Sequence, residues 1–260
     1  MARVTVEYQD HIAKVTLTRE DKMNALDNDM VQSIITAGQE VAASDARAVV
    51  LSGKGRGFCA GLDLANFAKM GQSDPTEWLM TRSHEDANVM QEIAMIWRRV
   101  PVPVIAVLQG AVYGGGLQLA LGADIRIAAP DAKFSIMEMK WGLVPDLGGM
   151  VLLPHLMRSD VLRLLTYTAD PVGAEQAERW GLVTEISEDA AARAQALAET
   201  IAGKSPSGMR AAKRLIDFAE TNTRADVLLE ESREQLTLIG KEDQMEVLAA
   251  QMQGRPPKFG

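Results

Sequence analysis

Glu138 is an acidic residue in a segment that is otherwise apolar. It follows a predicted strand and has Ile136, Met137 and Met139 beside it in the sequence. In such surroundings its carboxyl group would be desolvated, which raises the pKa of an acid toward the range where it can exchange protons near neutral pH. Glu138 is therefore a candidate general acid/base. The alternative is a surface glutamate paired with Lys140.

Asp146 is a second candidate acid, in the loop predicted over Trp141–Gly149. From there its carboxylate could face Glu138 across a substrate. Aspartate after a proline, here Pro145, is also a favourable N-cap, so Asp146 could instead cap the helix predicted after Leu147. The sequence leaves both roles open.

Two glycine-rich turns, each between a predicted strand and a predicted helix, are the strongest features of the sequence. One contains the three adjacent glycines 114–116 within Val104–Asp124, and the other is segment 53–61, GKGRGFCAG. The first N–H groups of a helix have no intrahelical acceptor, and the helix dipole adds partial positive charge there. The N–H groups of Leu62 and Gly115 could therefore bind one carbonyl oxygen and stabilise negative charge on it, as in an oxyanion hole.

The alternative for both turns is structural, since glycine allows a strand and a helix to pack closely. Neither turn matches a nucleotide-binding fingerprint. GAVYGGG is not G-x-G-x-x-G, and GKGRGFCAG lacks the Lys-Ser/Thr ending of a phosphate-binding loop.

Bulk properties exclude several classes of function. The 260-residue chain has a net charge of -8, which argues against nucleic acid or an anionic membrane surface as the main partner. The three histidines are far apart in the sequence, so we expect no metal site. No apolar run approaches the roughly 18 residues that span a membrane, and MARVTVEYQD does not resemble a signal peptide. Cys59 is the only cysteine; we expect it to be buried and structural, and the protein to be cytoplasmic.

The elements that must position these residues alternate between strands and helices as far as about residue 187, and helices follow alone. This order predicts an α/β core with a helical C-terminal region. Gln9–His11 is typical of a hairpin turn, and Asp27 of a helix N-cap. Strands are predicted at 3–8, 12–18, 48–52, 104–108, 125–128, 133–136 and 182–186, and helices at 27–43, 62–70, 77–100, from 117, and at 149–157, 161–168, 174–180, 190–202, 208–221, 223–238 and 243–253.

Several motifs, taken in order, resemble the enoyl-CoA hydratase/isomerase (crotonase) superfamily. Together they cover nearly the whole chain. They are KMNAL at 22–26, GFCAGLDL at 57–64, PVIA at 103–106 followed by GGG at 114–116, ADIR at 123–126, WGLVP at 141–145 followed by GG at 148–149, and AERWGLV at 177–183.

The resemblance implies an α/β fold built as a spiral of ββα turns, with a C-terminal helical region for trimerisation. We accordingly expect residues 1–190 to form the spiral core, which binds acyl-CoA and performs catalysis, and residues 191–260 to form the oligomerisation region. The implied partners are an acyl-CoA thioester substrate and further copies of the chain, as a trimer or a dimer of trimers. We expect no separate cofactor, because coenzyme A is part of the substrate.

The resemblance also assigns roles to site residues. It implies a catalytic glutamate at Glu138 and a thioester carbonyl held between the N–H groups of Leu62 and Gly115. The second glutamate of the hydratases corresponds to Gln118, whose amide can orient a water molecule but cannot take its proton. Gln118 could instead only satisfy buried backbone groups. Some isomerases of the superfamily carry an acid at the position of Asp146, and one dehalogenating branch uses an aspartate there as nucleophile.

Contacts with the CoA thioester are expected from both glycine-rich segments and from the KMNAL motif. Lys22, Lys54 and Arg56 could meet the phosphates of CoA, or they could be solvated surface charges. Asp63 is also expected to cap the helix that follows it. The predicted substrate-binding and CoA-binding residues are Lys22, Ala25, Ala60, Asp63, Leu64 and Gly114.

Two functions remain open. The first is an enzyme of fatty acid metabolism that hydrates a 2-enoyl-CoA or moves its double bond, with Glu138, Asp146 and Gln118 as candidate catalytic residues. Whole-chain similarity favours hydration, whereas the amide at position 118 favours isomerisation. The second is a non-catalytic acyl-CoA-binding subunit that has lost its chemistry. RNA binding, known for one branch of the superfamily, is disfavoured by the net charge of -8.

Overall fold

A six-stranded sheet lies at the centre of the computed structural model, which describes residues 2–65 and 74–260. Its first two strands form the expected antiparallel hairpin, turning at Asp10 and His11 with φ of 51° and 61°. The later neighbours in the sheet are parallel. In spatial order the strands are β1 (Val4–Gln9), β2 (Ile12–Leu17), β3 (Ala48–Gly53), β4 (Val104–Leu108), β6 (Ile125–Ala128) and β9 (Glu185–Ile186).

A second, smaller sheet has the order β5 (Ala111–Tyr113), β7 (Lys133–Ser135) and β8 (Val172–Gly173). Strand β4 of the large sheet leads to β5 of the small sheet and then to helix α5 (Gly115–Leu121). In the same way, β6 leads to β7, to the 3₁₀ helix η2 (Glu138–Trp141) and to α6 (Gly149–Leu156). These are ββα turns, as the resemblance implied. Strands β5 and β8 were not predicted because two or three residues are too few for an alternating pattern.

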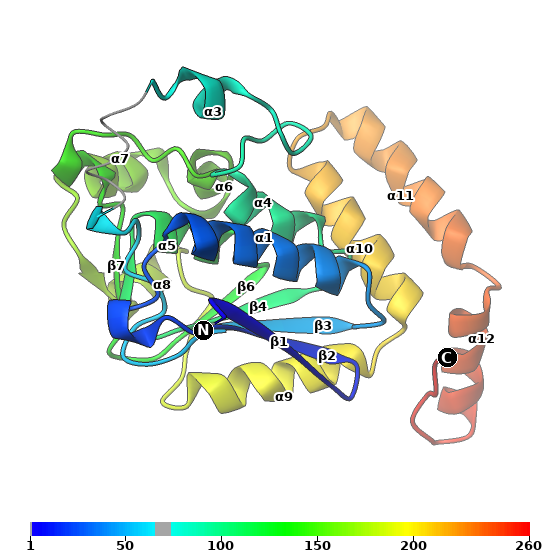
Figure 1. Cartoon of the computed structure of the whole chain (residues 1–260). Helices are drawn as coiled ribbons and strands as arrows, with labels where there is room; N and C mark the ends of the chain where they lie inside the picture. The colour runs from blue at the N-terminus through cyan, green and yellow to red at the C-terminus, as the bar shows by residue number, and fades with distance from the viewer. Residues whose placement is uncertain (1, 66–73) are drawn as a thin grey trace.

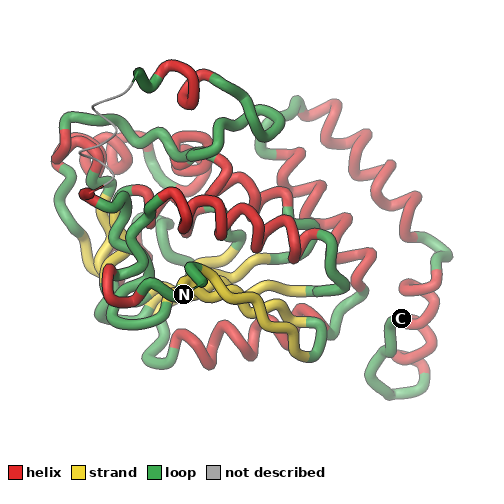
Figure 2. Tube along the Cα trace, viewed as in Figure 1, coloured by secondary structure: helices red, strands yellow, loops and turns green. Residues whose placement is uncertain are grey.

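Helices cover both faces of the large sheet (Figures 1 and 2). On one face lies α1 (Asn28–Ala42), where the side chain of Asp27 accepts from the Met30 N–H as the predicted N-cap. On the other face lies α9 (Ala190–Ala202). Its alanine stripe at every fourth position packs against buried strand residues such as Ile105 and Ile127. The expected boundary between a spiral core (1–190) and an oligomerisation region (191–260) remains a prediction. It falls at the start of α9.

The single long helix predicted at 77–100 is wrong. The chain forms α3 (Thr76–Met80), an irregular segment and then α4 (Glu92–Arg99). Glu85 interrupts helical geometry with φ of 54°. The carboxamide oxygen of Asn88 then accepts from the Met90 and Gln91 N–H groups, which starts a new helix. The helix predicted at 62–70 lies largely outside the described residues.

The other predicted helices are confirmed, with ends shifted by a few residues. They are α7 (Ser159–Thr168), α8 (Ala174–Arg179), α10 (Pro206–Ala219), α11 (Arg224–Leu238) and α12 (Glu242–Met252), and a short 3₁₀ helix η1 (Glu20–Lys22) precedes α1. Helices α11 and α12 lie outside α10, away from the sheet (Figure 1). In the described parts of the chain, no helix is long and apolar enough to cross a membrane.

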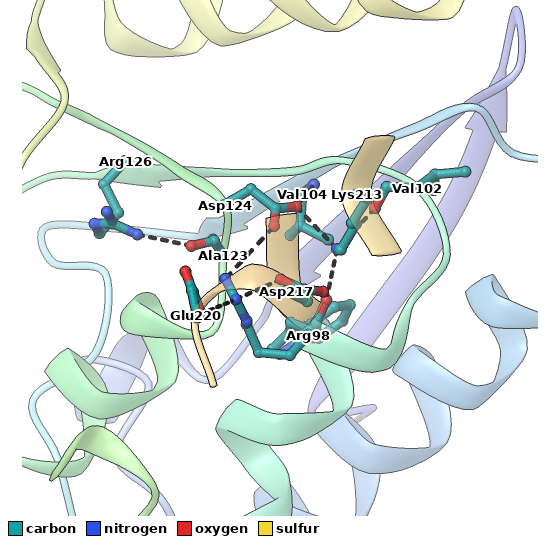
Figure 3. Close-up of polar contacts among 10 residues, drawn as sticks. Arg98, Val102, Val104, Ala123, Asp124, Arg126, Lys213, Asp217 and Glu220 are labelled. Carbon is teal, nitrogen blue, oxygen red and sulfur yellow. Dashed lines mark hydrogen bonds and ion pairs between the residues drawn. The ribbon is translucent and has the colours of Figure 1, made fainter. Parts of the chain in front are cut away.

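A buried lysine ties α10 to the sheet (Figure 3). The Nζ of Lys213 donates to the backbone oxygens of Trp97 and Val102 at 3.0 and 3.1 Å, and to Asp124 Oδ2 at 2.9 Å. The same Asp124 oxygen accepts from the N–H of Val104, the first residue of β4, at 2.7 Å. One ammonium group therefore joins α10, the end of α4 and the start of a central strand.

Arg98 of α4 adds a second connection to α10. Its guanidinium bonds Asp217 and Glu220, and its Nη1 lies 3.8 Å from Asp124 Oδ1. With these charges mutually paired, α10 is held against the core by ionic contacts as well as by apolar packing.

We expect Lys213→Met to lower the free energy of unfolding by about 3 kcal/mol, because it leaves the partly buried Asp124 carboxylate and two buried backbone oxygens without their ammonium partner. Urea unfolding measures the difference. Lys204→Met, at an exposed position, is the control and should change stability by less than about 0.5 kcal/mol. Equal stability of the two variants would contradict the anchoring role.

Candidate active site

A pocket of about 470 Å³ opens at the N-terminal end of α5. It gathers residues from loops that are more than a hundred positions apart in the sequence. Leu62, Gly115, Glu138 and Asp146 all line it, as do Lys22, Ala25, Arg56, Ala60, Asp63, Leu64 and Gly114. Nearly all the predicted site residues therefore share one cavity. Gln118 and Lys54 are not among its lining residues, and Lys54 is exposed and paired with Glu20.

The two glycine-rich turns lie directly against each other. Cys59 donates from its N–H to Ala111 O at 3.0 Å, and Tyr113 donates to Cys59 O at 3.1 Å. A Cβ at Gly116 would lie 2.3 Å from Cys59 O, and one at Gly61 would lie 3.6 Å from Gly115 N. The glycines therefore permit the close approach that the structural alternative expected, and this approach places Gly61, the residue before Leu62, beside Gly115.

The hydrogen bonds around Leu62 orient its amide. Leu26 donates to Gly61 O at 2.8 Å, and Asp63 donates to Leu26 O at 3.0 Å. Because these bonds use the atoms on either side of Leu62, its own N–H faces away from Leu26. Gly115 is the first residue of α5, so its N–H has no intrahelical acceptor. Two donors from distant parts of the chain thus belong to the wall of one pocket.

Asn24 holds the first of these turns, and sequence reasoning missed its role. Its Nδ2 donates to the backbone oxygens of Lys54, Gly57 and Phe58 at 3.0 to 3.1 Å. Its Oδ1 accepts from the Arg19 N–H at 2.9 Å. The residue is fully buried, with φ of 54°, a conformation that asparagine tolerates better than most residues. A polar residue inside the KMNAL motif was the available signal.

Glu138 is buried at the base of the pocket, with 9% of its surface exposed. Its Oε1 accepts from Gln118 Nε2 at 2.6 Å, while its Oε2 has no hydrogen-bond partner among the described residues. Burial raises the pKa of the Glu138 carboxyl, and the nearby charge of Asp146 adds to this, although hydrogen bonds from the backbone and from Gln118 oppose it. The alternative of a surface glutamate paired with Lys140 is wrong.

Asp146 lies at the exposed rim of the same pocket. It does not cap the following helix, because α6 begins after Gly148, which is its N-cap with φ of 89°. Partial burial raises the pKa of the Asp146 carboxyl. The two acids of the pocket are thus both shifted toward protonation and near enough to affect each other.

Comparison with known proteins identifies the family. The pattern that describes the enoyl-CoA hydratase/isomerase family matches residues 7–260. The chain belongs to this family. The 1,2-epoxyphenylacetyl-CoA isomerase of Escherichia coli K12 is 33% identical over 95% of this chain and 94% of its own length. The (E)-benzylidenesuccinyl-CoA hydratase of Thauera aromatica is 33% identical over 81% of this chain and 80% of its own.

Solved structures of the family have the same fold. The enoyl-CoA hydratase of Bacillus anthracis superposes with a TM-score of 0.88 at 27% identity, covering 99% of this chain and 98% of that one. Relatives of similar identity are thus named as isomerase and as hydratase, so similarity alone does not distinguish the two reactions.

Two further residues predicted as site or core have clear structural roles. The carboxylate of Asp63 accepts from the Ala65 N–H at 2.9 Å and pairs with Arg19 at 2.7 Å, while the helix that it was expected to cap lies largely outside the described residues. Both contacts lower the pKa of Asp63, the bond from Ala65 most. Cys59 is buried, and its Sγ donates to Asn24 O at 3.1 Å. In the parts of the chain that the structure describes, no group of three acidic, histidine or cysteine side chains could hold a metal ion.

We expect Asn24→Ala to reduce the free energy of unfolding by roughly 3 kcal/mol, because three backbone oxygens, two of them fully buried, lose their donor. The turn that carries Leu62 should loosen, so affinity for an acyl-CoA should fall as well. Urea unfolding and calorimetric titration measure the two effects. Asn222→Ala, which removes an exposed amide that donates to Phe218 O in the last turn of α10, is the matched control and should change neither. Unchanged acyl-CoA affinity in Asn24→Ala would contradict the positioning role.

Proposed function

We propose that this chain isomerises the double bond of an enoyl-CoA thioester by transferring a proton between two carbons of the acyl chain. The observation that carries the proposal is the buried Glu138, with one carboxylate oxygen unpartnered, in a pocket whose wall contains the amides of Leu62 and Gly115. Coenzyme A enters as part of the substrate, and we propose no separate cofactor.

The reaction begins with the thioester oxygen accepting from the Leu62 and Gly115 N–H groups. In a 3-enoyl thioester, the Glu138 carboxylate removes a proton from C2, and the electron pair moves into a dienolate whose oxygen carries the charge. A proton then returns to C4, so that the double bond lies between C2 and C3. Either Glu138 itself or Asp146 supplies this proton. No atom is gained or lost overall.

The two amides stabilise the dienolate more than the neutral thioester, because charge develops on the oxygen that they bind. One such donor contributes about 3 kcal/mol to lowering the barrier. Because the pKa of Glu138 is raised, it lies closer to the pKa of the C2–H group of the substrate, which favours proton transfer from C2 to the carboxylate. At the pocket mouth, Lys22 and Arg56 supply positive charge for the phosphates of CoA.

Hydration is the runner-up. It is favoured by the relative from Thauera aromatica, which is named a hydratase. It is disfavoured here because the side chain beside Glu138 is the amide of Gln118, which cannot take a proton from water. A non-catalytic acyl-CoA-binding subunit remains the alternative from another class, motivated by the same substitution.

We also propose self-association through the C-terminal helices, as a trimer or a dimer of trimers, and a cytoplasmic location. Support for association comes from large apolar side chains that are exposed on α11, on α12 and between them, among them Leu228, Leu236, Ile239 and Leu248.

Glu138→Gln should lower kcat/KM for isomerisation of a 3-enoyl-CoA by about 100- to 10,000-fold, since the amide cannot exchange the proton. Binding of a saturated acyl-CoA, followed by calorimetry, should persist. Lys140→Gln, two positions away and exposed, is the control and should retain activity. Full activity in Glu138→Gln would refute the assignment, whereas tight binding without any turnover in the unmodified chain would favour the non-catalytic alternative.

The unmodified protein should convert a 3-enoyl-CoA to the conjugated 2-enoyl-CoA faster than it hydrates the 2-enoyl-CoA. The reason is that isomerisation needs one proton-transferring group at a time, whereas hydration also needs an activated water. Absorbance of the conjugated thioester follows both reactions, since it rises in the first and falls in the second. Faster hydration than isomerisation would reverse the order of our two candidate reactions.

A further inference from the structure

Gln118 is buried behind Glu138, with 2% of its surface exposed, and its two ends bind different elements. Its Nε2 donates to Glu138 Oε1 at 2.6 Å. Its Oε1 accepts from the backbone N–H groups of Leu147 at 2.8 Å and Gly149 at 3.0 Å. The amide therefore connects one acid of the pocket to the turn that directly follows the other.

The orientation of this amide is determined by its neighbours. If its oxygen and nitrogen were exchanged, an acceptor would face the Glu138 carboxylate, and an NH₂ group would face two N–H donors. An amide nitrogen donates but does not accept. Oε1 of Glu138 must therefore remain an acceptor, and any proton on Glu138 lies on Oε2, the oxygen without a partner among the described residues.

The turn before α6 is shaped around the same amide. A Cβ at Gly149 would lie 2.8 Å from Gln118 Cγ and 2.9 Å from its Oε1. Gly148 has φ of 89°, a conformation suited to glycine, and Asp146 precedes Leu147 directly. The path of the backbone next to Asp146 thus depends on the two bonds that Gln118 accepts.

We propose that Gln118 is a positioning residue, which keeps Glu138 Oε2 free for proton transfer and fixes the turn that carries Asp146. This inference rests on the proposed function, because it assigns the atom of Glu138 that exchanges the proton. Gln118 does not line the pocket, so it acts through the two acids.

The hydrogen bond from Gln118 acts on the charged form of Glu138. It lowers the pKa of Glu138, against burial and the charge of Asp146, which raise it. The other charged groups that line the pocket are Asp21, Lys22, Arg56 and Asp63. Losing the donor should therefore raise the pKa of Glu138. On acidification, the carboxylate that removes the proton would then be protonated at a higher pH than in the unmodified protein.

The test is the pH profile of kcat/KM for Gln118→Met, which keeps the length of the side chain and removes both polar ends. We expect the acidic limb to move upward by about one pH unit, as loss of a hydrogen bond to a charged group implies. Gln118→Glu retains an acceptor for the turn and places a second carboxylate beside Glu138, so its limb should also move upward. Leu119→Ala, at a buried neighbour outside the pocket, should lower stability and leave the limb in place.

A readout without turnover separates this inference from the proposed function. Isotope-edited infrared titration of the carboxyl groups, with Glu138→Gln identifying the Glu138 band, gives the pKa of Glu138 directly in each variant. An upward shift in Gln118→Met, with no enoyl-CoA converted by any variant, would refute the isomerase but uphold the positioning role. An unmoved pKa in a folded Gln118→Met protein would overturn the positioning role.

If Gln118→Met does not fold, Gly149→Ala supplies the same comparison. Its methyl group would press on Gln118 from the turn, and the helical backbone at position 149 accepts alanine. The Glu138 pKa should rise in this variant too, and an unchanged value there would also overturn the inference.

Discussion

The close approach of α5 to the chain around Cys59 is the contact on which the pocket depends. A Cβ at Gly116 would lie only 2.3 Å from the Cys59 carbonyl oxygen, so the helix start could not lie there with any side chain. The bonds between the Cys59 segment and β5 fix the register of this contact. Since Leu62 follows that segment and Gly115 begins the helix, it is backbone packing that brings both residues to the wall of one pocket.

The second constraint is the burial of Glu138, which favours an uncharged side chain beside it. A carboxylate that leaves water needs hydrogen bonds, yet a second carboxylate beside it would raise its pKa further by repulsion. The Gln118 amide satisfies one oxygen of Glu138 without adding charge. The relatives include both a hydratase and an isomerase. The Gln118–Glu138 pair is the feature of this chain on which our proposal of isomerisation depends.

Much of this organisation could be predicted from the sequence, because it depends on local patterns. The β1–β2 hairpin, the Asp27 cap and the alternation of strands and helices follow from periodicity and turn residues. The family motifs predict that Leu62, Gly115, Glu138 and Asp146 belong to one site, and all four line one pocket.

The features that were missed depend on contacts between distant segments. Asn24 bonds backbone oxygens thirty or more positions away. Gln118 satisfies buried backbone groups, as one alternative expected, but its bond to Glu138, twenty positions away, was not foreseen. The break between α3 and α4 arises where the Asn88 side chain competes with the helix for backbone N–H groups, which apolar periodicity does not reveal. Very short strands such as β8 and β5 are defined by their hydrogen bonds to the neighbouring strand β7, which the local sequence does not show.

The only thiol of the chain, Cys59, directly precedes Ala60 and Gly61, which line the pocket. A conjugated enoyl thioester is an electrophile that alkylates thiolates, so a reactive cysteine here would be at risk from the very compounds the site is proposed to handle. Burial raises the pKa of Cys59 to about 12, and its Sγ–H donates to the Asn24 carbonyl oxygen. Because the thiol is buried and stays protonated, it is a poor nucleophile and is protected from alkylation.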